Sequence, residues 1–197
     1  MLTVRHIERL WNARKYGELL NELISIRLEA VAQPDLSEKA CIAAAALGVI
    51  RLDELNQGYV PACSKLIRAI IAGQERDGGW GNAMTTALCL AALTRQQGQG
   101  PAVDRGMTYL AQLQQADGIW PRIPMRRMPE DATASAFVLL QLGDNHQFRE
   151  TIRYEAAMAW FRSHNLEGEP AAQALWNRAR VRSMLVESNS EYLQFAN

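Results

Sequence analysis

An arginine-rich segment is the part of this sequence whose residue types point most directly to binding chemistry. Residues 121–128 contain two prolines and the candidate binding residues Arg122, Met125, Arg126 and Arg127. Guanidinium groups pair with carboxylates and phosphates, and methionine and arginine are both enriched in protein interfaces. The segment is therefore a candidate site for a carboxylate, a phosphate or diphosphate, or an acidic protein surface. The alternative is a solvated loop whose charges favour solubility.

Residues that bind metals or act as nucleophiles do not form a recognisable pattern. The three histidines and three cysteines are His6, His146, His164, Cys41, Cys63 and Cys89. The histidines are scattered without i, i+4 spacing, and the cysteines are odd in number and lie in apolar surroundings. The sequence has neither a phosphate-binding P-loop nor a G-x-S-x-G nucleophile motif. We expect no metal site and no cofactor.

A seven-residue pattern, Q-x-x-D-G-x-W, occurs twice with a separation of 40 residues. Its members are Gln74, Asp77, Gly78 and Trp80 in the first copy, and Gln114, Asp117, Gly118 and Trp120 in the second. Asp-Gly is a turn dipeptide, the glutamine amide can satisfy backbone groups, and tryptophan supplies a broad apolar surface. We interpret the pattern as a structural clamp between stacked helical units.

The elements that position these residues are predicted to be helices. Amphipathic segments with apolar residues at three- and four-residue steps alternate with Ala-rich, nearly all-apolar segments. Four helical hairpins follow: 18–32 with 37–52, 60–73 with 83–96, 102–115 with 130–142, and 147–163 with 170–186. We predict a single all-α domain over residues 1–197, with an N-terminal helix in 1–15, hairpin repeats in 16–186 and a polar tail in 187–197.

Two irregularities distinguish the repeats. The loop His164–Pro170 matches the pattern only as His-x-x-Glu-Gly-x-Pro, as expected of a terminal repeat. Trp80 precedes Thr86 by six residues, whereas Trp120 precedes Thr133 by thirteen. We assign the seven additional residues to the arginine-rich segment, which we expect to form a loop on one rim of the repeats.

Composition limits the classes of function. The chain has 197 residues, 48% of them hydrophobic, with 21 basic and 21 acidic side chains. Formal neutrality argues against a nucleic-acid-binding protein. No apolar run is long enough to cross a bilayer, and the first residues lack the apolar stretch of a signal peptide. We expect a cytoplasmic protein without a transmembrane segment.

The two motif copies resemble the QW repeat of the terpenoid cyclase and protein prenyltransferase superfamily, which includes the squalene-hopene cyclases. The resemblance covers residues 60–142 and implies an α/α toroid. Toroids of this superfamily have about six hairpins around an apolar cavity. With four hairpins visible here, the expected fold is a shortened, toroid-like arc.

The resemblance also implies one candidate catalytic residue. Squalene-hopene-type cyclases carry D-x-D-D-T-A, and the nearest match is the segment from Pro129 to Ala134, in which Asp131 aligns with the general acid. Pro129 and Ala132 replace two companion aspartates of that motif. Without them, Asp131 also fits a first-turn helix residue. The zinc motifs of the prenyltransferases are absent.

Two functions remain as hypotheses. The first is a non-catalytic binding or scaffold module that binds a protein or an anionic ligand through the rim loop. The second is a small isoprenoid-processing enzyme with Asp131 as proton donor and the arginines holding a diphosphate. The N-terminal segment, with Ile7, Leu10 and Trp11 at helical spacing, is suited to cap the first hairpin or to dock on a second copy in a homodimer.

Overall fold

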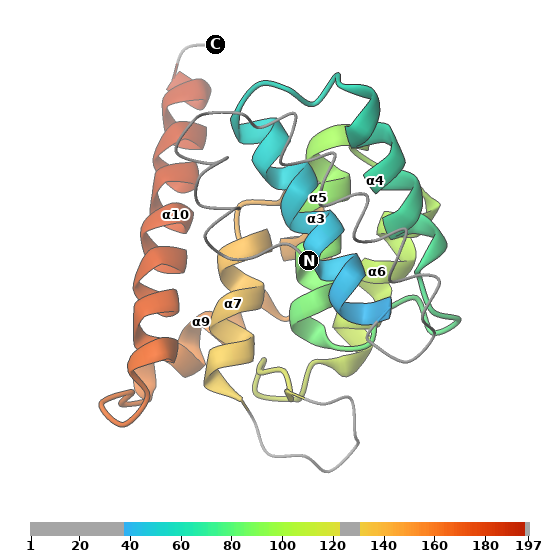
Figure 1. The fold of residues 1–197 in the computed structure, drawn as a ribbon. Coiled ribbons are helices and arrows are strands. Elements are labelled where there is room, and N and C mark those ends of the chain that lie inside the picture. Colours follow the sequence, from blue (N-terminus) through green and yellow to red (C-terminus); the bar gives the residue numbers. More distant parts are fainter. Residues whose placement is uncertain (1–37, 123–130, 196–197) are drawn as a thin grey trace, which may run out of the picture. The chain divides into compact units, whose positions relative to one another are not determined.

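The computed structural model describes residues 38–122 and 131–195, and within these ranges every element is an α-helix (Figure 1). The all-α prediction is confirmed. The helices are α3 (Glu38–Glu54), α4 (Pro61–Ala72), α5 (Ala83–Gln97), α6 (Pro101–Leu113), α7 (Ala132–Leu142), α8 (His146–Thr151), α9 (Tyr154–Ser163) and α10 (Pro170–Phe195). The helices predicted in 1–15 and 18–32 lie outside the described residues. None of the described helices combines the length and the apolar character needed to cross a membrane.

The chain divides into two compact units, Met1–Gly73 and Gln74–Asn197. The prediction of one continuous domain stays a prediction. In the first unit, α3 packs against α4. A Cβ atom added at Gly48 would lie 3.1 Å from Leu66 Cδ1, so the missing side chain lets the two helices approach closely.

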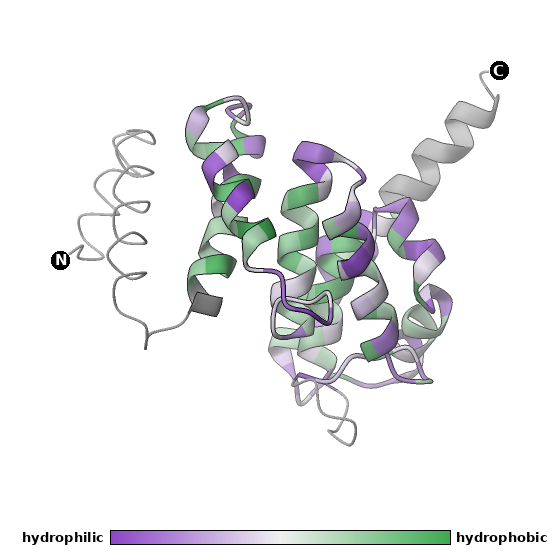
Figure 2. Cartoon of the chain, turned by 90° about the vertical axis from the view of Figure 1, so that its right-hand side faces the viewer, coloured by the Kyte–Doolittle hydropathy of each residue, from purple (hydrophilic) through white to green (hydrophobic). Residues whose placement is uncertain are grey.

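The second unit contains three helices, α5, α7 and α10, that follow one another through direct contacts, α5 with α7 and α7 with α10. Helix α6 packs on α5 (Figure 1), and α8 packs on α6. Most residues of α5 and α7 are buried, as their Ala- and Leu-rich sequences require, whereas α6 buries one face through Val103, Met107 and Leu110. Hydrophilic residues gather at helix ends and in the loops (Figure 2).

Helices α3 to α7 begin and end within two residues of the predicted ranges. The continuous helix predicted over 147–163 is wrong, because the chain leaves the helical conformation between α8 and α9. Ile152 is extended, with φ −107° and ψ 171°, and Arg153 has φ −80° and ψ 64°. The amide of Arg153 donates to Gln114 Oε1 at 2.8 Å instead of continuing the helix.

The predicted end of the last helix at Val186 is also wrong, because α10 continues to Phe195. The residues predicted as a polar tail are therefore helical up to that point. Neither glycine nor proline occurs after Pro170, so the sequence has no residue that would end the helix earlier.

Candidate functional site

Both copies of the repeated pattern form the same turn. Asp77 Oδ1 accepts a hydrogen bond from the amide of Gly79 at 2.9 Å, and Asp117 Oδ1 accepts one from Ile119 at 3.1 Å. A backbone bond of 2.9 Å closes each turn, from Glu75 N to Gly79 O in the first copy and from Gln115 N to Ile119 O in the second. The aspartates are therefore used as turn-forming groups.

The two glutamines connect each turn to the start of the next outer helix. Gln74 Nε2 donates to Gly78 O and to Ala102 O, both at 2.8 Å, and Gln74 Oε1 accepts from the side chain of Arg105. These contacts span from the turn to α6 and give the glutamine the role of a cross-link between neighbouring hairpins.

In the second copy, Gln114 is buried and makes the equivalent cross-link. Its Nε2 donates to Gly118 O at 2.8 Å and to Arg153 O at 3.3 Å, while its Oε1 accepts from Arg153 N. The guanidinium of Arg153 returns a hydrogen bond of 2.8 Å to Gln115 O. The turn and the start of α9 are thus joined through three hydrogen bonds.

The glycines of the two turns lie against the backbone of the next outer helix. Both have positive φ, 91° at Gly78 and 92° at Gly118. A Cβ at Gly78 would lie 2.6 Å from Arg105 O, and one at Gly118 would lie 2.3 Å from Ala157 N. A Cβ at Gly168, in the loop His164–Pro170 that matches the pattern only partly, would meet no atom within 4 Å. The close approach therefore exists only where another hairpin follows.

The two tryptophans are buried between the hairpins. Trp80 lies against α6, because a Cβ at Gly106 would be 2.9 Å from its ring. Trp120 stacks on Phe148 of α8 with ring centroids 6.2 Å apart, and its Nε1 donates to Leu110 O at 2.8 Å. Each indole therefore packs against a helix that follows its turn, Trp80 against α6 and Trp120 against α8.

A hydroxyl and a helix cap follow each tryptophan. The amide of Trp80 donates to Thr86 Oγ1 at 3.0 Å, and Asn82 caps α5 by accepting from Thr85 N at 2.9 Å. The amide of Trp120 donates to Ser135 Oγ at 2.8 Å. The counterpart of Thr86 is therefore Ser135, and the sequence alignment of Thr86 with Thr133 is wrong.

The corrected alignment lengthens the insertion in the second copy. Trp80 precedes its cap residue Asn82 by two residues, and Trp120 precedes the cap residue Asp131 by eleven, so the insertion has nine residues rather than seven. Its two ends are held together by a hydrogen bond of 3.2 Å from Asp131 N to Trp120 O.

Asp131, the candidate general acid, is the N-cap of α7. Its Oδ1 accepts from Ala134 N at 2.7 Å, and the residue is half-buried. It has the same place and the same type of contact as Asn82 in the preceding repeat. Capping satisfies an amide at the helix start, and an amide side chain performs it as well as a carboxylate.

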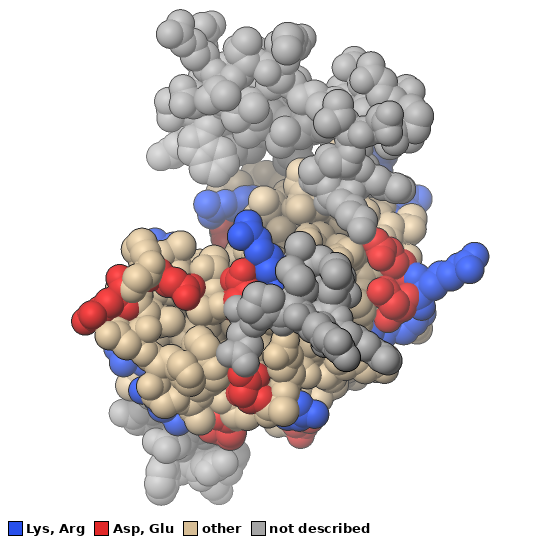
Figure 3. Space-filling model, turned by 90° about the horizontal axis from the view of Figure 1, so that it is seen from below, with Lys and Arg blue, Asp and Glu red and all other residues tan. Residues whose placement is uncertain are grey.

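The arginine-rich segment, residues 121–128, is only partly within the described residues. Arg122 is exposed at the base of the insertion. Met125, Arg126 and Arg127 lie outside the residues that the structure describes. Basic and acidic side chains are interspersed on the face drawn in Figure 3.

Among the residues that the structure describes, no three His, Cys, Asp or Glu side chains are close enough together to hold a metal ion. Cys63 and Cys89 are fully buried. Burial raises the pKa of the Cys89 thiol to about 12, and it raises the pKa of Cys63, with a smaller contribution from Asp53. Both thiols are kept protonated by these environments, which does not suit a nucleophile.

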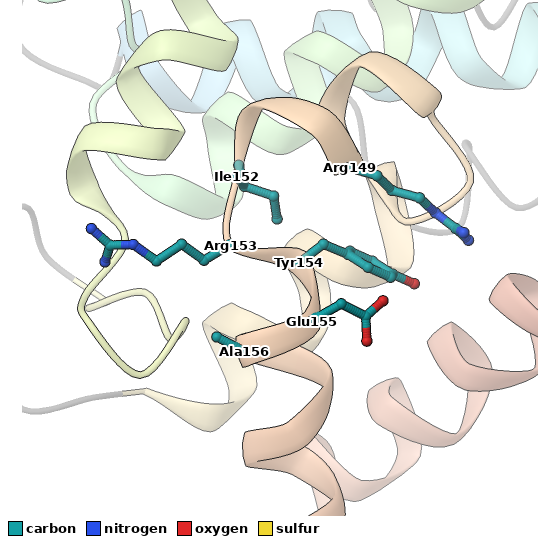
Figure 4. A pocket seen from close by; sticks show the side chains of 6 residues that line it. All are labelled: Arg149, Ile152, Arg153, Tyr154, Glu155 and Ala156. Atoms are coloured by element: carbon teal, nitrogen blue, oxygen red, sulfur yellow. The ribbon is translucent and has the colours of Figure 1, made fainter.

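A surface hollow of about 470 Å³ lies where α8 meets α9 (Figure 4). Six residues line it: Arg149, Ile152, Arg153, Tyr154, Glu155 and Ala156. The sequence analysis identified none of these residues, because the hollow depends on the break between the two helices.

Comparison with known proteins adds no relative: no protein-family model and no curated protein matches the sequence, and no solved structure matches the fold. The described residues form an all-α structure in which each of the two matching turns is joined to a later helix by a glutamine cross-link and carries a buried tryptophan. The resemblance to the QW-repeat superfamily rests on the motif residues alone.

Proposed function

We propose that this protein is a non-catalytic binding or scaffold module on a shortened fold of the terpenoid cyclase and prenyltransferase type. In this proposal, the inserted rim loop binds an acidic protein partner or an anionic ligand. The observation that carries the proposal is the insertion of nine residues into one copy of an otherwise matching turn. Insertions in repeat proteins commonly form the binding face.

The order of the helices supports the toroid-like part of the proposal. Helices α5, α7 and α10 each follow one of three corresponding loops, and they contact one another in that order. The outer helix α6 packs on α5. This is the arrangement expected for consecutive hairpins of an α/α arc, in which one helix of each hairpin lies inside and the other lies outside.

The environment of Asp131 favours the binding module over the enzyme. A carboxylic acid that protonates carbon needs neighbouring groups that raise its acidity and stabilise its conjugate base. Asp131 instead uses an oxygen to accept the amide of Ala134, and Asn82 makes the same contact in the other copy. A position that accepts either Asp or Asn at the same helix start is explained by capping alone.

The base of the rim loop supports a binding role. The hydrogen bond between Asp131 N and Trp120 O fixes both ends of the insertion on a buried tryptophan and a helix start. Arg122 is exposed beside this anchor. Arginines on an anchored loop can pair with carboxylates or phosphates at a low cost in backbone entropy.

The proposal is tested by charge reversal in the rim loop. The variant carries Arg122→Glu, Arg126→Glu and Arg127→Glu, and its matched control carries Arg162→Glu, Arg178→Glu and Arg180→Glu at exposed positions of α9 and α10. Binding of an oligoglutamate peptide and of inorganic diphosphate is measured by calorimetry at constant ionic strength. Loss of paired charges is expected to weaken binding of one of these probes at least about tenfold in the rim variant only.

Equal weakening in both variants, or no binding of either probe, would contradict the proposal. The enzyme hypothesis has a separate test. Native mass spectrometry of the untreated protein, followed by incubation with an isoprenoid diphosphate, would favour it if the protein retained an isoprenoid or if turnover occurred and was abolished by Asp131→Asn. The same mass spectrum reports whether the protein is a monomer or a homodimer. The cytoplasmic location stays a prediction.

A further inference from the structure

Helix α10 extends beyond the helix that supports it. Arg182 donates to Leu140 O at 3.1 Å, and a Cβ at Gly143 would lie 3.4 Å from Ser183 Oγ, so α7 ends level with residues 182–183 of α10. Helix α10 continues to Phe195, and Figure 1 shows it running on past the end of α7. The part after Ser183 is about 18 Å long at 1.5 Å per residue. A helix of this length is only marginally stable in water without a packing partner.

The part of α10 before Ser183 has a buried side and an exposed side. The buried side includes Trp176 and Ser183. On the exposed side, residues recur at steps of three and four along the helix: Ala171, Ala174, Arg178 and Val181. Val181 is 54% exposed. This spacing keeps a row of positions on one side of a helix, and it is the spacing of a coiled-coil seam.

The same spacing continues to the end of α10. The next positions of the row are occupied by Leu185, Ser188, Tyr192 and Phe195. We call the row from 171 to 195 the outward stripe; every one of its positions except 178 and 188 has an apolar residue type. Two helices pack stably when apolar residues occupy such a seam. The stripe therefore suits a second helix that lies along α10.

The charges of α10 change sign where its support ends. Residues 170–183 include three arginines and no acidic residue, whereas residues 184–195 include two glutamates and no basic residue. Arg182 is paired with Asp144, and Arg178 and Arg180 are exposed. A second α10 in the antiparallel direction would place the basic half of each helix beside the acidic half of the other. A parallel copy would place like charges together, which is unfavourable.

An antiparallel pair centred on residue 183 also matches the outward stripe with itself. Residues 171–182 and 184–195 are segments of equal length, so the unsupported half of one helix would lie along the supported half of the other. In this register Ala171 is opposite position 195 and Ala174 is opposite position 192, so small residues meet the positions of Phe and Tyr. Position 181 is opposite position 185, and position 180 is next to position 187. A two-fold axis makes each of these contacts twice.

We propose that α10 is a dimerisation helix that binds a second copy of this chain, antiparallel and two-fold symmetric, through the outward stripe. The inference goes beyond the proposed function and does not depend on it, because the arginine-rich segment contributes no residue to the stripe. The partner is a second copy because the two halves of α10 complement each other in length, in charge and in the size of the opposing residues.

The test is sedimentation equilibrium of the full-length protein over a range of concentrations, in which a reversible dimer is expected. Val181→Asp introduces a charge near the centre of the stripe and should raise the dissociation constant of the dimer at least about tenfold. The control variant Leu47→Asp makes the same kind of change at a residue of α3 that is 52% exposed, and it should leave the dissociation constant within about twofold. Circular dichroism checks that both variants keep their helical content.

A charge exchange tests the antiparallel register. Arg180→Glu and Glu187→Arg should each raise the dissociation constant about threefold, because each places like charges together at two symmetric contacts. The double variant should return it to within about twofold of the original value, since the pairs are restored with opposite orientation. Arg68→Glu, at an exposed position of α4, is the control for the change in net charge.

Three results would overturn the proposal. The first is a monomer at every concentration up to about 0.1 mM, which would leave the outward stripe to a different protein or to another segment of this chain. The second is an equal effect of Val181→Asp and Leu47→Asp on the dissociation constant. The third is a double variant that dimerises no better than Arg180→Glu, which would exclude the antiparallel register.

Discussion

Gly118 and Gly168 hold the same position in the repeated pattern, and we predict that replacement by alanine destabilises the protein strongly at Gly118 and hardly at Gly168. Gly118 has φ 92°, and an added Cβ would lie 2.3 Å from Ala157 N and 2.7 Å from the carbonyl carbon of Ala156. A Cβ added at Gly168 would meet no atom within 4 Å. The difference arises because a helix of the next hairpin lies against the first glycine only.

The expected loss of unfolding free energy in Gly118→Ala is the sum of two separate costs. Holding alanine at a positive φ costs about 1–3 kcal/mol. Displacing the backbone of α9 to remove the overlap costs about 1–3 kcal/mol more, so Gly118→Ala should lower the free energy of unfolding by about 2–6 kcal/mol. Gly168→Ala should change it by less than about 0.5 kcal/mol. Gly78→Ala should resemble Gly118→Ala, because its Cβ would lie 2.6 Å from Arg105 O.

The assay is urea unfolding followed by tryptophan fluorescence. Four of the five tryptophans, Trp80, Trp120, Trp160 and Trp176, belong to the second unit and report on it directly. Midpoints are compared at unchanged slope, since an unchanged slope means that the same surface is exposed on unfolding. If Gly118→Ala and Gly168→Ala had equal midpoints, the proposed overlap with α9 would be wrong.

Three further predictions use the same preparations. Gln114→Leu should cost about 2–4 kcal/mol in urea unfolding, because it leaves Arg153 N and Gly118 O without their buried partner, and Gln74→Leu should cost less because water reaches that half-buried side chain. Equal costs would contradict this difference. Asp131→Ala should lose a cap worth about 1 kcal/mol in thermal melts, whereas Asp131→Asn should keep it, as Asn82 does. A large loss in Asp131→Asn would refute the capping role. Burial, with Asp77 and then Glu75, raises the pKa of Tyr109 from 10.0 to about 12. The folded protein therefore retains this proton where the unfolded chain loses it, and the contribution of Tyr109 to stability should decline between these pH values. Ultraviolet titration of the protein and of Tyr109→Phe measures the ionisation of this tyrosine. An identical decline of stability with pH in Tyr109→Phe would refute the assignment to Tyr109.

The sequence was sufficient to predict the bounds of the helices that depend on local periodicity. The Ala-rich run of α5 and the amphipathic spacing of α6 predicted both helices within two residues of their ends, because helical burial repeats every three or four residues. The pattern in 74–80 likewise predicted a turn, since Asp and Gly favour one wherever they occur together.

The features that the sequence did not reveal depend on contacts between distant residues. The break between α8 and α9 is accompanied by a hydrogen bond from Arg153 to Gln114, 39 residues earlier. No local sequence pattern predicts this break. The insertion length was misjudged because Thr133 repeats the residue type of Thr86, while the true counterpart is Ser135. A common spacing was available: Asn82 precedes Thr86 by four residues, and Asp131 precedes Ser135 by four.

The hydrogen bond between Asp131 N and Trp120 O has a consequence for how this protein can be altered. It brings together the two ends of the segment inserted after Trp120, so the helical framework fixes the distance that this segment has to span. Because the entropy of closing a loop grows only with the logarithm of its length, doubling the segment should cost about 0.6 kcal/mol. We therefore expect residues added within this segment to lower the stability of the helical framework only slightly.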